Sequence, residues 1–137
     1  IGRILIPVNG TDVSRRAAEA AFALAKTGDS RVSALYVTSG RPDGRRGRTR
    51  RGSAIRRNEE IVLKDIADLA DRYDARVRTA LRVDVAAEDA ILKEVERGGY
   101  DLIVLGVTRR PGETLFFGNM AAALLEHCET ALLFVAS

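Results

Sequence analysis

The chain is poor in the residues on which thiol and metal chemistry depend. It has one cysteine, Cys128, and one histidine, His127, among 137 residues. A single cysteine cannot form an internal disulfide, which predicts a reducing, cytoplasmic compartment. One cysteine and one histidine are also too few for an ordinary zinc site. Because the two are sequence neighbours on a predicted helix, their side chains point in different directions, which disfavours a cysteine–histidine nucleophile.

Long apolar runs are also missing. No run approaches the roughly 20 residues that a membrane-spanning helix needs. No secretory signal precedes the first predicted strand. The sequence opens with Ile1 instead of Met, which indicates a processed chain or a piece excised from a longer protein. Its length fits one core, and it has no internal repeat, so we expect a single domain over residues 1–137.

The positive charge is concentrated in one segment. Eight arginines and one acid, Asp43, give Arg41 to Arg57 a charge of +7, so the rest of the chain carries −4 of the net +3. No aromatic residue interrupts this segment, which disfavours binding of nucleic acid by base stacking. The interpretations that stay open are a solvated insertion, a contact with an anionic membrane surface, and nucleic-acid binding, which only the basic cluster favours.

Strand-like and helix-like segments alternate along the chain. The predicted strands are 3–9, 31–38, 75–83, 101–106 and 131–136, and the predicted helices are 13–26, 54–73, 85–98 and 120–127. Residues 39–53 form a predicted arginine-rich loop. The expected helix N-caps are Thr11 or Asp12, Asp84 and Asn119, and Gly28 is expected to end the first helix. This order predicts an open parallel sheet with helices on both faces, in a Rossmann-like α/β fold.

Two strands have the composition of sheet edges. In 75–83, small and apolar residues share one face and Arg76, Arg78 and Arg82 share the other, which predicts a half-exposed edge strand. The last strand, "ALLFVA" (131–136), has no charge. It is either central in the sheet or an edge that pairs with its twin in a homodimer.

Three segments should converge beyond the carboxyl ends of the strands, where such sheets bind ligands. They are "PVNGTD", residues 36–38, and "GVTRRPGETLFFGNM" (106–120). The first and third precede helices, whose N-termini favour anions. Gly106 indicates a close backbone approach or an unusual φ. Gly118 and Asn119 either present backbone N–H groups to a phosphate or merely start the last helix.

Two long stretches resemble the universal stress protein domain. They are "RILIPVNGTDVSRRAAEAA" near the start and "DLIVLGVTRR…FFGNMAAALLE" near the end, so the resemblance covers nearly the whole chain. It implies a five-stranded parallel sheet of order 3-2-1-4-5, of the adenine nucleotide alpha hydrolase-like type. It also implies a homodimer formed through the last strand, and binding of ATP or another adenine nucleotide, with or without Mg²⁺.

The family's phosphate loop reads Gly, two residues, Gly, nine residues, Gly, then Ser or Thr. This chain departs from that pattern at Arg109, which replaces the second glycine, and at Asn119, which replaces the hydroxyl residue. Asn9 stands where the family has aspartate after its first strand. The residues that the resemblance implies for the nucleotide site are Pro7, Val8, Asn9, Val37, Gly106, Arg109, Arg110, Gly112, Gly118, Asn119 and Met120.

These departures change the chemistry that the site can offer. Arg109 removes a backbone that could approach phosphates closely, but Arg109 or Arg110 can offer a guanidinium in exchange. Gly112, after Pro111, supplies a turn that re-routes the loop. Asn9 can bond a ribose hydroxyl but is a weaker ligand than aspartate for a divalent ion. No residue suggests a general base, so we expect a binding protein and not an enzyme.

The stretch "RRPGETLFFGN" resembles the variant in universal stress domains appended to bacterial cation/proton antiporters. This resemblance implies a cytosolic regulatory domain on a membrane transporter. The alternative is a dimerisation or interaction module whose nucleotide site has degenerated.

Overall fold

The computed structural model describes residues 2–38, 48–83, 86–109, 115–116 and 118–136. Arg110, Gly112 and most of the predicted loop 39–53 lie outside these residues. The five parallel strands are β1 (Arg3–Val8), β2 (Arg31–Thr38), β3 (Val77–Val83), β4 (Leu102–Arg109) and β6 (Ala131–Ala136). Their order is β3-β2-β1-β4-β6. The predicted order of five parallel strands is therefore confirmed, and the third and fifth of them are edges.

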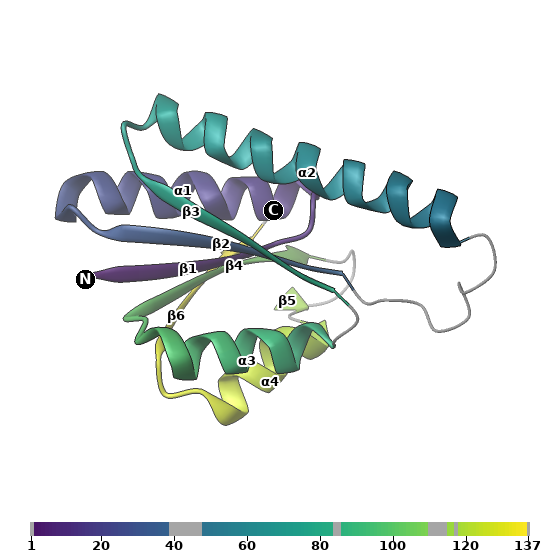
Figure 1. The fold of residues 1–137 in the computed structure, drawn as a ribbon. Helices are drawn as coiled ribbons and strands as arrows, with labels where there is room; N and C mark the ends of the chain where they lie inside the picture. The colour runs from purple at the N-terminus through teal and green to yellow at the C-terminus, as the bar shows by residue number, and fades with distance from the viewer. Residues whose placement is uncertain (1, 39–47, 84–85, 110–114, 117, 137) are drawn as a thin grey trace.

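The helices cover both faces of the sheet (Figure 1). They are α1 (Asp12–Gly28) and α2 (Arg48–Arg72) on one face, and α3 (Ala87–Gly98) and α4 (Gly118–His127) on the other. Each layer buries its own apolar cluster, one around Phe22 and Ile66, the other around Ile91 and Leu124. In the described part of the chain, no helix has both the length and the apolar character needed to cross a bilayer.

The two largest differences from the predicted element boundaries are at the start of α2 and at the end of β4. Helix α2 begins at Arg48 instead of Ala54, so the predicted loop 39–53 is too long. Arginine is a good helix former, and the apolar spacing marked only the part of the helix that contacts the sheet. Strand β4 continues past Gly106 to Arg109, because its end pairs antiparallel with a short strand, β5 (Leu115–Phe116).

The helix ends confirm two predictions and correct two others. Thr11 is the N-cap of α1 and Gly28 is its last residue, as expected, and the left-handed residue that follows is Asp29, with φ 53°. Helix α3 begins at Ala87 with Ala86 as its N-cap, and no side chain caps it. The cap predicted for Asp84 is therefore wrong, and Asp84 itself lies outside the described residues. Helix α4 begins at Gly118, so Asn119 is a helical residue and not the N-cap.

Candidate functional site at the switch point of the sheet

Strands β1 and β4 are neighbours that pair only near their beginnings. Their ladder consists of Ile4 with Leu102 and Leu5 with Ile103, whereas β1 remains paired with β2 as far as Val8. Toward their carboxyl ends β1 and β4 therefore run side by side without a ladder between them. The helices that follow these two strands, α1 and α4, cover opposite faces of the sheet (Figure 1). This arrangement is the topological switch point at which open α/β sheets bind ligands.

Gly106 lies on β4 at this point. A Cβ placed on it would meet the carbonyl oxygen and Cγ1 of Val13 at 2.5 Å each. Gly106 is not among the described glycines with positive φ, which are Gly10 and Gly99. Of the two reasons that the sequence suggested for this glycine, close approach therefore applies, and the approaching group is the first turn of α1. Gly106 allows α1 to sit against β4 and so sets the position of the loop after β1.

Asn9 occupies that loop and is exposed. Its Oδ1 accepts a hydrogen bond from the Thr11 N–H at 3.1 Å and another from the Thr11 hydroxyl at 2.7 Å. Because a backbone N–H can only donate, the atom facing Thr11 must be the amide oxygen. The Asn9 N–H in turn donates to Ser14 Oγ at 3.3 Å. These bonds fix the side chain and leave its NH₂ group to donate to a ligand.

This geometry does not favour a resident metal ion. The Asn9 amide oxygen is the atom that would coordinate a cation, and it already accepts two hydrogen bonds. Within the described ranges, no three histidine, cysteine, aspartate or glutamate side chains gather as metal ligands. The described residues at the switch point therefore do not fit a protein-held Mg²⁺. A Mg²⁺ that accompanies a nucleotide would depend mainly on the phosphates.

The predicted walls of the site belong to the ends of two strands. Pro7 and Val8 are buried at the end of β1. Val37, on β2, is half-buried and packs against the apolar cluster under α3 and α4. Because these side chains are buried or half-buried, a ligand would contact mainly the backbone at the ends of the two strands.

The other predicted site residues lie at the end of β4 or after it. Arg109 is its last residue, and its backbone pairs with Leu115 of β5. Gly118, Asn119 and Met120 form the first turn of α4. The N–H groups of a first turn have no partner inside the helix, so this turn is suited to receive an anion. The structure thus places Arg109 at the end of β4, the α4 turn after β4, and Asn9 after β1.

Sequence reasoning missed Glu59, a carboxylate on α2 that is only 2 % exposed. Its Oε2 has no hydrogen-bond partner in the described part of the chain. Burial, followed by the charge of Glu59, raises the pKa of Tyr36, which pairs with Val8 at the same end of the sheet. The sequence pattern could have indicated this burial, because Glu59 falls at helical spacing between Ile55 and Val62, in the apolar stripe of α2.

A sequence model of the universal stress protein family matches residues 1–136. The chain belongs to the universal stress protein family. A universal stress protein of Methanocaldococcus jannaschii is 29 % identical to this universal stress domain over 140 residues, which cover 97 % of the chain and 81 % of that relative.

Solved structures of the family share the fold. A universal stress protein from Lactobacillus plantarum has a TM-score of 0.82 at 18 % identity, with 98 % of this chain and 97 % of that one covered. A universal stress protein from Archaeoglobus fulgidus in complex with dAMP has a TM-score of 0.73 at 18 % identity, covering 98 % and 97 %. An Arabidopsis thaliana family member with AMP bound has a TM-score of 0.71 at 16 % identity, covering 99 % and 92 %.

Proposed function

We propose that this universal stress domain binds an adenine nucleotide, such as ATP, at the switch point and acts as a cytoplasmic regulatory sensor. The observation that carries the proposal is the end of the β1–β4 ladder after Leu5 and Ile103, with the Asn9 amide on one side and the first turn of α4 on the other. Binding of AMP and dAMP by proteins of the same fold supports this ligand class.

Each group at the switch point has a role in this proposal. The Asn9 NH₂ donates to a ribose oxygen. The first-turn N–H groups of α4, at Gly118, Asn119 and Met120, receive the phosphates. The base lies against the ends of β1 and β2, and Arg109 and Arg110 contribute guanidinium groups in place of the family's glycine. We propose binding without turnover, because neither the sequence nor the described site supplies an evident general base.

Isothermal titration calorimetry with ATP and AMP, with and without Mg²⁺, tests the proposal. At ligand concentrations about 100-fold above Kd, binding should add roughly 2.7 kcal/mol to the free energy of unfolding. Asn9→Ala should weaken binding about tenfold, as expected for one lost hydrogen bond to the ligand. Asn58→Ala is the matched control, since Asn58 is exposed on α2. Chromatography of the titrated sample should recover the ATP unhydrolysed.

The absence of heat and of any thermal shift at millimolar ATP would overturn nucleotide binding. It would favour the alternative function, an interaction module with a degenerate site, for which Arg109 in the second glycine position is the specific reason.

We also propose that the domain forms a homodimer through β6. In the described part of the sheet β6 lies at the end of the parallel strands and pairs with β4. Leu133 on this strand is 36 % exposed. An uncharged, partly apolar edge is suited to pairing with a second strand.

The resemblance of "RRPGETLFFGN" to antiporter-linked universal stress domains supports a further proposal, that this domain is appended to a cation/proton antiporter. An antibody raised against the domain should then detect, in the membrane fraction of the source cells, a polypeptide much larger than 14.9 kDa. A soluble band of 14.9 kDa alone would contradict the proposal.

A further inference from the structure

Four arginines line a cavity of about 330 Å³ between the sheet and α3. Arg3 comes from β1, Arg78 and Arg82 from β3, and Arg97 from α3. Glu94 is the one acidic side chain among the described residues that line it. The sequence placed Arg78 and Arg82 on the outer face of an edge strand. Strand β3 is an edge, but these two arginines also line an open cavity whose lining does not include Arg76.

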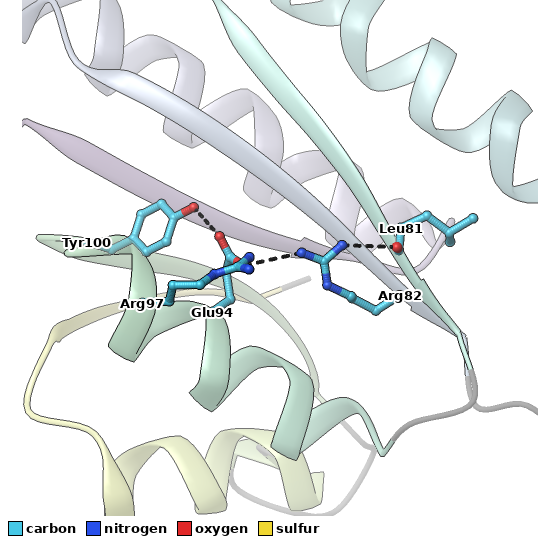
Figure 2. A network of polar contacts seen from close by, with 5 residues as sticks. All are labelled: Leu81, Arg82, Glu94, Arg97 and Tyr100. Atoms are coloured by element: carbon cyan, nitrogen blue, oxygen red, sulfur yellow. Dashed lines mark hydrogen bonds and ion pairs between the residues drawn. The ribbon is translucent and has the colours of Figure 1, made fainter.

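Glu94 is the centre of a polar network in this cavity (Figure 2). Its Oε1 lies 2.6 Å from Arg97 Nη2 and 3.7 Å from Arg82 Nη2, and its Oε2 accepts a 2.8 Å hydrogen bond from the Tyr100 hydroxyl. Burial acts to raise the pKa of Glu94, but the hydrogen bonds from Tyr100 and Arg97 and the nearby arginine charges outweigh it, so the pKa is lowered. Glu94 is therefore ionised at neutral pH.

One carboxylate does not neutralise the positive charge of the arginines that line this cavity. Arg82 and Arg97 share Glu94, whereas the Arg3 guanidinium lies over the Tyr100 ring, 5.1 Å from its centroid. The Arg78 side chain has no hydrogen-bond or ion-pair partner among the residues that the structure describes. Four guanidinium groups against one carboxylate leave the lining with a charge of +3. Arg82, Arg97 and Glu94 are enough to join α3 to β3. A purely structural role for the network therefore does not explain the presence of Arg3 and Arg78.

The surplus charge indicates a ligand of opposite sign. Cavities lined by one sign of charge, with walls of low dielectric, concentrate counter-ions. The planar guanidinium fork is suited to the paired oxygens of phosphate and carboxylate groups. A cavity of about 330 Å³ is at the small end of ligand pockets, which suits a compact anion better than a whole nucleotide.

We propose that this cavity, the basic cavity, binds a small anion with two or more phosphate or carboxylate groups, and that Glu94 competes with that anion for Arg82 and Arg97. The basic cavity is lined by residues of β1, β2, β3 and α3, and its β1 residues are Arg3 and Leu5 in the first half of that strand, whereas the switch point follows the carboxyl ends of β1 and β4. The proposal therefore does not depend on nucleotide binding.

The test is a titration of the ¹⁵N-labelled domain with sodium pyrophosphate at low ionic strength, followed by NMR. The backbone signals of the lining residues Ser33, Ala80 and Gly98 should shift in a saturable way, and should do so equally in the presence of saturating ATP. Arg78→Gln should weaken binding at least fivefold. Arg76→Gln is the matched control, because it removes the same charge from a neighbouring residue outside the lining, and it should change the affinity less than twofold.

Glu94→Gln provides the result that a purely structural network cannot give. Glutamine can still accept the hydrogen bond from Tyr100, but it no longer competes for the arginines, so pyrophosphate should bind several-fold more tightly. A parallel titration with citrate distinguishes carboxylate from phosphate ligands. The proposal is overturned if pyrophosphate shifts only Gly106 and the α4 turn and is displaced by ATP, if Arg78→Gln and Arg76→Gln behave alike, or if Glu94→Gln weakens binding.

Discussion

Gly106 is important because it has no Cβ atom. Its backbone is not left-handed, so a turn does not explain the glycine. The explanation lies in Val13, whose carbonyl oxygen and side chain occupy the space that any Cβ would need. The same contact brings the first turn of α1, with Thr11 and Asn9 before it, to the side of β4. Because Gly106 has no side chain, α1 can pack close to β4, and this packing sets the position of Asn9, the candidate ligand donor.

Gly106→Ala should therefore destabilise the domain by about 1–3 kcal/mol, the usual cost of forcing an extra methyl group into a packed core. Urea denaturation monitored by circular dichroism measures this change. Adding Val13→Ala removes the Cγ1 contact but not the contacts with the carbonyl oxygen and carbon at 2.5 and 2.7 Å. The double variant should therefore recover only part of the loss. Full recovery would show that the side chain, and not the helix backbone, limits the approach.

Individual residues were predictable where their type dictates their role. Thr11 as an N-cap and Gly106 as a close approach follow from the chemistry of a hydroxyl group and of a missing Cβ. The hydrogen-bonding state of Asn9 was not predictable, because it depends on Thr11 turning back toward it. Glu59 was overlooked because charged residues are expected on the outer face of a helix, although its spacing placed it in the apolar stripe.

At the scale of elements, the two edges of the sheet differ in charge. Strand β3 carries arginines, a common protection of an edge against unwanted pairing, whereas β6 carries none. On β6, Leu132 and Phe134 pack against the cluster under α3 and α4, and Val135 packs against the opposite cluster. Leu133 remains 36 % exposed. These contacts occupy both faces of the strand, and β6 is the last of the parallel strands on its side of the sheet.

Leu133→Lys should convert the proposed dimer into a monomer, because a lysine at the edge of a sheet disfavours pairing with another strand. Light scattering coupled to size-exclusion chromatography should give 14.9 kDa for this variant and twice that mass for the wild-type domain. The control is Leu125→Lys, an equally apolar position on α4 with 55 % exposure, which should remain dimeric. A monomeric wild-type domain, or a dimeric Leu133→Lys variant, would rule out pairing through β6.

The elements themselves were predictable to the extent that they contact the core. The apolar spacing of α2 begins only at Ile55, so its first residues, from Arg48, were assigned to a loop. Strand β5 has two residues, and its pairing with Thr108 and Arg109 depends on how the chain returns, which local composition does not specify. The edge positions of β3 and β6 followed from charge and from the family's strand order.

At the scale of the whole molecule, a basic segment adjoins a body of opposite charge. Residues 41–57 carry +7 and the remainder −4. The second half of this segment lies in α2, and Figure 1 shows the first turns of that helix extending beyond the sheet. We propose that this cationic end of the chain's longest described helix meets an anionic surface. This arrangement suits a domain held near a membrane by a linked transporter.

We expect the domain to sediment with vesicles of phosphatidylcholine and phosphatidylserine, and not with phosphatidylcholine alone. Each basic residue near an anionic leaflet contributes about 1 kcal/mol. A variant with five substitutions to glutamine should therefore lose binding, and the matched variant with lysine at the same positions should keep it. The five positions are Arg45, Arg46, Arg48, Arg50 and Arg51. Binding should also vanish in roughly 1 M salt, where the screening length falls to about 3 Å. Retained sedimentation of the glutamine variant would exclude the basic segment as the membrane contact. Equal binding to vesicles without phosphatidylserine would exclude an electrostatic origin altogether.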